Sequence, residues 1–206
     1  MTIKNKIQRV IDKWLSIALL CCLTFISIIN SHAQAQVILR ERFHHYNIQP
    51  QSVAEIKIEL RKHSPVNKEN QLFHGGTQWK LFPKFGWKIE NNLCRIKEVV
   101  VYLEGEYTLP KMSNRTTSTE TLKRTFDLYY DNLVDHEKGH QALWIEAGEE
   151  ISRKLKSMPA HYLCEHLKRQ GMAMVNDIVA DYQMRNSKYD ITTEHGKTQG
   201  VFIEAQ

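Results

Sequence analysis

The feature that most constrains the fold of this chain is an apolar stripe of helical period in its second half. Residues 117–120 (TSTE) have the capping-box spacing that begins a helix, and Pro159 ends the segment. Steps of three and four residues place the members of the stripe on one helical face: Leu122, Phe126, Tyr129, Leu133, Leu143, Ala147, Ile151 and Leu155. A long helix with one apolar face has to bury that face against a second layer.

Candidates for the second layer lie on both sides of this helix in the sequence. Residues 95–109 are rich in β-branched and aromatic side chains, which favours a strand, and residues 43–48 are a shorter candidate. A short helix is expected from a cap at Ser52 to about Lys62, and a second long helix over residues 160–185, before a polar tail. We therefore predict an α+β fold in which a small antiparallel sheet packs with the two long helices.

The first 35 residues have the parts of an export signal. A basic region up to residue 14 precedes an apolar run over residues 15–29, and Ala33 and Ala35 form an A-x-A cleavage site. The run is shorter than the ~20 residues that a membrane span needs. We expect a signal peptide over residues 1–35, cleaved after Ala35, with an uncleaved N-terminal anchor as the alternative. Residues 36–206 would then be a single exported domain, periplasmic or secreted.

Most of the formal net charge of +5 belongs to that export segment. Residues 1–35 carry four basic side chains and one acidic one, whereas the other 171 residues carry 24 and 22. A domain this close to neutral gives no electrostatic reason to expect a nucleic-acid partner. Contact with a membrane is expected only through the N-terminal segment, if that segment is not cleaved.

The cysteines agree with export. Two of the four lie in the apolar run of the signal, so the exported domain keeps Cys94 and Cys164. In an oxidising compartment an even pair predicts one disulfide, and two buried free thiols are the alternative. The chain lacks the C-x-x-C spacing of a zinc–thiolate site at either cysteine.

The apolar stripe is interrupted by two histidines. His136 and His140 lie at the in-phase positions of the stripe, about 40° apart around the helix. With Glu137 between them, residues 136–140 (HEKGH) form an H-E-x-x-H motif. Two neutral imidazoles on successive turns bind one Zn²⁺ and leave a position for water, whose pKa the ion lowers to about 7. Glu137 would take the proton of this water. The alternative is two histidines at the edge of the core beside a surface glutamate.

The third zinc ligand does not follow from spacing alone. A metzincin-type extension of the motif would need a glycine and a histidine where this chain has Leu143 and Glu146. The remaining candidates are two acidic residues of the second helix and three histidines: Glu165, Asp177, His161, His166 and His195.

The helix motif and the tail together resemble a family of secreted bacterial zinc-dependent proteases catalogued as domain of unknown function 922. The similarity covers the chain from about Phe43 to Gly200. It rests on Trp79, Trp87, Cys94-Arg95-Ile96, Tyr107-Thr108-Leu109-Pro110, residues 136–140, Cys164, Tyr189-Asp190, Thr193-Glu194-His195-Gly196 and Gln199-Gly200.

This resemblance implies a zincin-like fold and site. It makes His195 the third zinc ligand beside His136 and His140. Tyr189 would hydrogen-bond the oxyanion, and Asp190 would orient a ligand histidine by hydrogen bonding to it. The alternative for both residues is a role in docking the tail.

The resulting functional hypothesis is an exported zinc metallopeptidase. Glu137 would activate water to hydrolyse amide bonds of a peptide or protein substrate. Two alternatives remain: a non-catalytic envelope protein with a structural metal site, and a zinc amidase or esterase that acts on cell-envelope material.

Overall fold

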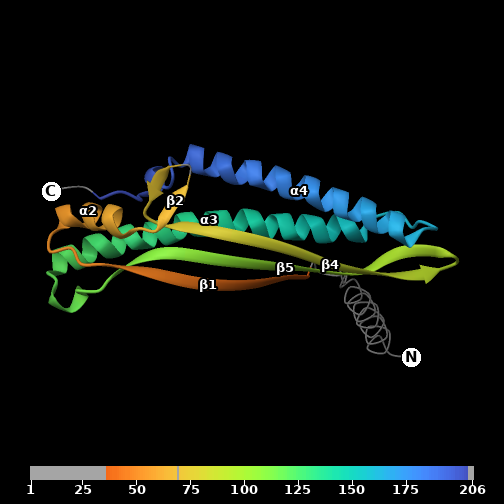
Figure 1. Cartoon of the computed structure of the whole chain (residues 1–206), viewed down its shortest axis with the longest axis horizontal. Coiled ribbons are helices and arrows are strands. Elements are labelled where there is room, and N and C mark those ends of the chain that lie inside the picture. The colour runs from red at the N-terminus through yellow and green to blue at the C-terminus, as the bar shows by residue number, and fades with distance from the viewer. Residues whose placement is uncertain (1–35, 69, 204–206) are drawn as a thin grey trace, which may run out of the picture. The chain divides into compact units, whose positions relative to one another are not determined.

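A computed structural model of the chain describes residues 36–68 and 70–203. The residues from Ala35 onward form one compact unit, and the expected signal peptide over residues 1–35 lies outside the described residues. In chain order the elements are β1 (Gln36–Ile48), α2 (Val53–His63), β2 (Val66–Lys68), β3 (Gln71–Phe73), β4 (Gly76–Glu90), β5 (Leu93–Met112), α3 (Glu120–Lys156) and α4 (Cys164–Thr192). The predicted α+β class, with two long helices, is confirmed (Figure 1).

The main sheet is mixed, so the prediction of a purely antiparallel sheet is wrong for one of its two pairings. Its strand order is β1-β5-β4, with β4 antiparallel to β5 and β1 parallel to β5. A two-residue turn at Asn91 and Asn92, both with left-handed backbone, forces β4 and β5 to be antiparallel. β1 reaches β5 only through α2, the β2–β3 hairpin and β4, and a hydrophobic pattern carries no information on strand direction.

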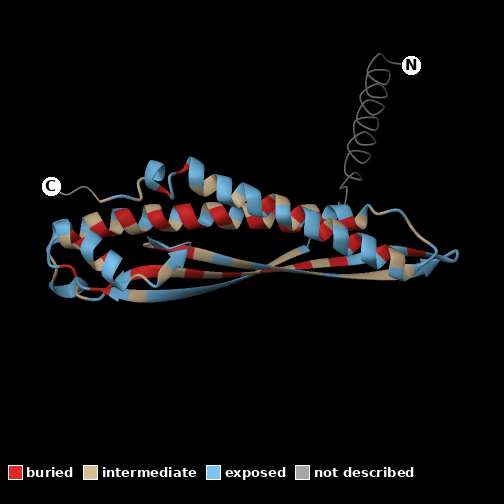
Figure 2. Ribbon diagram, turned by 45° about the horizontal axis from the view of Figure 1, so that its top comes forward, coloured by how far each residue is buried: buried red, intermediate tan, exposed pale blue. Residues whose placement is uncertain are grey.

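The apolar face of α3 covers one face of the sheet (Figure 2). Val101, Leu103 and Leu109 of β5 are buried. The buried residues separate into two clusters. One contains Leu103 with Ala147 and Ile151, and the other contains Leu109 with the first half of α3 and with α2. The turn of α3 that carries the two histidines lies between the parts of α3 that enter these clusters. On the far side of that turn Trp144, rather than the expected Leu143, is buried.

Helix α4 starts later and ends later than the sequence predicts. It begins at Cys164 and continues to Thr192, so residues 186–192, expected in a polar tail, form its last two turns. The apolar pattern stops at Tyr182 because the inward-facing residues beyond it are polar. After Thr193 the chain turns through Glu194, His195 and Gly196, all with positive φ, into the 3-10 turn Lys197–Gln199.

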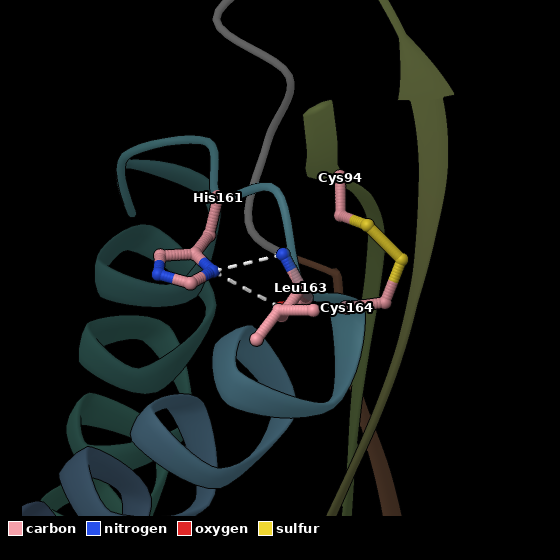
Figure 3. Close-up of a disulfide and its surroundings, with 4 residues drawn as sticks. All are labelled: Cys94, His161, Leu163 and Cys164. Atoms are coloured by element: carbon pink, nitrogen blue, oxygen red, sulfur yellow. Dashed lines mark hydrogen bonds between the residues drawn. A yellow bond between two sulfur atoms is a disulfide. The ribbon is translucent and has the colours of Figure 1, made fainter. Parts of the chain in front are cut away.

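The predicted disulfide between Cys94 and Cys164 is confirmed (Figure 3). It joins the start of β5 to the first residue of α4. Beside it, the backbones of Cys94 and His161 exchange two hydrogen bonds, with N–O distances of 2.7 and 3.0 Å. The N-terminal end of α4 is thus fixed both covalently and by backbone pairing. Within residues 36–68 and 70–203, no helix is both long and apolar enough to cross a membrane.

Candidate metal centre

Two histidines of α3 and one aspartate of α4 meet at a single point. His136 and His140 are 4% and 5% exposed, so both imidazoles are buried between the helices. Their Nε2 atoms lie 3.3 and 3.0 Å from the same oxygen, Oδ1 of Asp190. The late end of α4 makes this possible, because a helix that stopped at residue 185 would not carry Asp190 to α3.

The opposite ring nitrogens show which tautomer each histidine adopts. His136 Nδ1 lies 2.9 Å from Oε1 of Gln199, and His140 Nδ1 lies 2.8 Å from Oδ1 of Asn186. An amide oxygen only accepts hydrogen bonds, so with the amide oxygens facing the rings each Nδ1 carries a proton and donates it. In the neutral imidazole the lone pair is then on Nε2, which faces Asp190.

The resulting donor set could hold a metal ion. One nitrogen from each histidine and one oxygen of Asp190 all lie within 4.8 Å of one another. This triad is not the H-E-x-x-H motif itself, because its carboxylate comes from a different helix. Hydrogen bonds from ligand histidines to a second layer of acceptors, as made here by Asn186 and Gln199, are usual around protein-bound metals.

The negative charge of Asp190 and a positive charge on the neighbouring histidines stabilise each other. Burial acts to raise the pKa of Asp190, but hydrogen bonds from His136 and His140, donated when their Nε2 atoms carry a proton, outweigh burial and hold that pKa well below its usual range. Burial acts to lower the pKa of His136, and its bonds to Asp190 and Gln199, with the charge of Glu137, raise it on balance. The pocket between the helices therefore favours a carboxylate with a positive charge beside it.

Glu137 lies next to the triad and is held by a strand. It is 3% exposed, and its Oε2 accepts a hydrogen bond of 2.5 Å from Thr77 Oγ1 at the start of β4. Since Thr77 engages one oxygen, Oε1 is the carboxylate atom left to accept a proton. The motif glutamate is thus placed by the sheet and not by α3 alone.

Tyr189, expected at the oxyanion, packs against the backbone of α3. Its ring stacks on that of His136 with centroids 5.2 Å apart, and its hydroxyl lies 3.3 Å from the carbonyl oxygen of His136. A Cβ atom on Gly139 would overlap this hydroxyl, so the glycine of HEKGH makes room for Tyr189. Burial raises the pKa of Tyr189, which keeps the phenol protonated as a donor.

His195, expected as the third ligand, lies at the rim of the site. Its Nδ1 is 3.7 Å from Asp190 Oδ1, its side chain is 47% exposed, and its ring contacts that of Phe73 with centroids 4.8 Å apart. It is not one of the three groups that converge. Asp177 precedes Asp190 by 13 residues of helix, which is about 20 Å. The other candidates for the third ligand, His161, Glu165 and His166, precede Asp177 and so lie still farther from Asp190 along the axis of α4.

A cleft opens beside the triad. Its volume is about 540 Å³, and both histidines, Glu137 and Asp190 line it. The β2–β3 hairpin, including Leu72 and Phe73, also lines this cleft. The candidate metal ligands are therefore next to a space that could admit a second molecule.

Several residues of the site were not predicted. Thr77, Asn186 and Gln199 each hold a motif residue by one hydrogen bond. A single polar residue in a strand or a helix, such as Thr77 or Asn186, gives no sequence signal for such a contact, whereas Gln199 belongs to the tail motif but had no expected role in the site. The spacing of Asn186 and Asp190, one helical turn apart, would have been informative only if α4 had been predicted to reach them.

Comparison with known proteins identifies one family. A model of the family described as a bacterial protein of unknown function, DUF922, matches residues 43–196, well over half of the chain. The chain belongs to this family. No curated protein and no solved structure matches it significantly. The predicted membership in DUF922 is confirmed, while the family description assigns no activity, so the protease function and the zincin-like fold stay predictions.

Proposed function

We propose that this DUF922 protein is an exported zinc metallopeptidase whose ion is held by His136, His140 and Asp190. The observation that carries the proposal is the convergence of both Nε2 atoms on one carboxylate oxygen while both Nδ1 atoms are committed to amide oxygens. Two lone pairs and an anionic oxygen directed at one buried point require a cation between them. Either a proton on one imidazole or a metal ion can fill that role.

The chemistry of the donors favours zinc over hard cations. Imidazole nitrogens with one carboxylate are common ligands of catalytic zinc, which keeps a further position for water or substrate. The same set also suits Fe²⁺. Glu137, buried beside the triad, supports hydrolysis because it supplies a base for water.

In this proposal the residues of the chain divide the work of amide hydrolysis. A bound zinc ion would polarise the substrate carbonyl and acidify water. Glu137 Oε1 accepts the proton of the attacking water and passes it to the nitrogen of the leaving amine, while Thr77 keeps Oε2 in place. Asn186 and Gln199 hold the two imidazoles with Nε2 toward Asp190.

We assign the third ligand position to Asp190 and place His195 beside it. Asp190 is already within 3.3 Å of both histidine nitrogens, and the carboxylate comes from a regular helix. His195 sits in a left-handed turn and lines the cleft, so we propose that it faces the substrate. The role of Tyr189 in this scheme is to position His136 and the end of α4.

The cleft favours a catalytic site over a closed structural one. A structural zinc site fills all four positions with protein groups, whereas here the cleft reaches both histidines and Asp190. An amidase or esterase acting on cell-envelope material would use the same residues, and only the substrate distinguishes it from a peptidase.

The test is metal analysis and peptide hydrolysis with the wild type and Glu137→Gln. We expect one zinc per chain in both proteins, and a loss of about 10²–10⁴-fold in kcat/KM in the variant. Glu149→Gln, an exposed change on the same helix, is the matched control and should keep full activity. Hydrolysis that survives Glu137→Gln would contradict the mechanism. Ester but no peptide turnover would shift the proposal to the esterase alternative.

A further inference from the structure

Four large apolar side chains are exposed together at the end of the β4–β5 hairpin. Ile89 and Leu93 flank the turn of the hairpin and are 68% and 38% exposed. Tyr162 and Leu163, just before α4, are 69% and 53% exposed. We call these four residues the hairpin-end patch.

The disulfide and the backbone bridge keep the patch together. Ile89 is the cross-strand partner of Cys94, and Leu93 directly precedes Cys94. Cys94 is bonded to Cys164, next to Leu163 (Figure 3). The backbone of Cys94 also pairs with that of His161, next to Tyr162. All four apolar side chains are therefore anchored within one or two residues of the same covalent link.

The patch has the character of a membrane-interface site. Its hairpin half has an apolar side chain on each face, because the cross-strand pairing places Ile89 on the face of Cys94 and Leu93 on the other. A flat protein partner would cover one face, whereas lipid surrounds both. Specific protein interfaces also bury about 800 Å² per partner, far more than four side chains at a hairpin end supply.

Basic residues lie close to the patch along the chain, together with the acidic Glu90 and Glu165. Lys88 lies next to Ile89, and Lys168 and Arg169 lie in the first two turns of α4. In the described part of the chain none of these three has an anionic partner. Arg95 and Lys97 share one carboxylate, that of Glu90. Exposed apolar residues with unpaired cations beside them match an anionic lipid surface.

We infer that the hairpin-end patch docks the protein on the interface of an anionic lipid bilayer, with Ile89, Leu93, Tyr162 and Leu163 inserted among the headgroups. The inference does not depend on the proposed catalysis. It differs from the expectation that only the N-terminal segment contacts a membrane. Since α4 has a rise of 1.5 Å per residue, the docked end would lie about 40 Å along this helix from Asp190.

The test measures lipid contact at the patch itself, through a tryptophan placed there, because the apolar run over residues 15–29 can also bind lipid. Tyr162→Trp is mixed, as the full chain, with vesicles of phosphatidylcholine and phosphatidylglycerol that contain brominated phosphatidylcholine, which quenches nearby indoles. Leu128→Trp, equally exposed on α3, is the control. We expect quenching beyond the wild-type level for Trp at 162 only, and less of it without phosphatidylglycerol.

A second variant connects the quenching with the apolar side chains. Adding Ile89→Asn to Tyr162→Trp should weaken lipid affinity by about tenfold, from the loss of one buried aliphatic side chain. Ile58→Asn, an exposed change on α2, should leave it unchanged. Equal quenching at 128 and 162, or none at either, would overturn the inference. So would a dimer that Ile89→Asn dissociates, because the patch would then be a contact between copies of the chain.

Discussion

The two ends of α4 are attached to the rest of the protein by different means. At the N-terminal end, Cys164 is bonded to Cys94, and Leu167, Val175 and Ile178 are buried in an apolar cluster. At the C-terminal end, after Tyr182, the residues that face α3 are polar, among them Asn186 and Asp190.

This difference separates stability from the candidate function. Covalent and apolar attachments hold the first part of α4 with or without a ligand. The last two turns are held by hydrogen bonds among ionisable and amide groups, which contribute less net free energy each. A bound cation would therefore stabilise mainly the C-terminal end of α4, which lines the cleft.

The largest expected effect comes from removing the covalent attachment. Cys94→Ser with Cys164→Ser opens a loop between residues 70 apart. The chain-entropy model then gives a loss of about 4 kcal/mol in the free energy of unfolding. Zinc affinity should change by less than about tenfold, because the disulfide at the N-terminal end of α4 has no contact with the candidate metal ligands. Denaturant titration and a zinc-binding isotherm measure the two quantities. A folded variant that had lost zinc binding would show that the two ends are coupled.

The next effect is at the other end of the helix. Asp190→Ala should weaken zinc binding by at least about a hundredfold, because even residues that only orient metal ligands account for 10–100-fold. Asp177→Ala, on an exposed position of the same helix, is the control and should bind zinc as the wild type does. Competition with a chromophoric chelator gives the affinities.

His195→Ala distinguishes the two candidates for the third ligand. A loss of less than about tenfold is expected if Asp190 is the ligand and His195 faces the substrate. If His195→Ala removed zinc and Asp190→Ala did not, the assignment of Asp190 would be incorrect.

The smallest effect compares two glycines at the contacts of α4. Gly139→Ala places a methyl group on the hydroxyl of Tyr189, which is fixed by its own hydrogen bonds. We expect a loss of about 1–3 kcal/mol from overpacking, together with weaker zinc binding. Gly171→Ala brings a Cβ to 3.0 Å from Leu155 Cδ2 and to 3.2 Å from Phe85 Cζ, both at the ends of side chains.

For Gly171→Ala the gain in helix propensity, about 1 kcal/mol, should offset most of the destabilisation that the close contact of the added Cβ causes. Thermal unfolding of both variants, with and without zinc, measures the difference. If both glycines proved equally tolerant, the close packing of Tyr189 on α3 would not be needed for the site.

Local patterns predicted the parts of the fold that depend on one segment. The stripe from Leu122 to Leu155 gave α3 because helical period is a property of adjacent turns. The disulfide followed from the expected export of the domain and from the count of two cysteines in it. The direction of β1 and the extent of α4 did not follow, because both depend on contacts between segments far apart in the chain.

The same distinction holds for the candidate site. His136, Glu137 and His140 were found because their spacing carries the chemistry within one helix. Asp190 was expected only to orient a histidine, because residues 186–192 carry no apolar pattern and were assigned to a tail. In the structure these polar residues continue α4, since their partners on α3 are themselves polar.

The most direct test of the account is the position of a zinc ion in a crystal of the protein grown with zinc, located by anomalous scattering at the zinc edge. The account predicts one ion between α3 and α4, about 2.0–2.2 Å from Nε2 of His136, Nε2 of His140 and a carboxylate oxygen of Asp190. An ion bound to His195 with Asp190 outside bonding distance, or no ion between the two histidines, would contradict it.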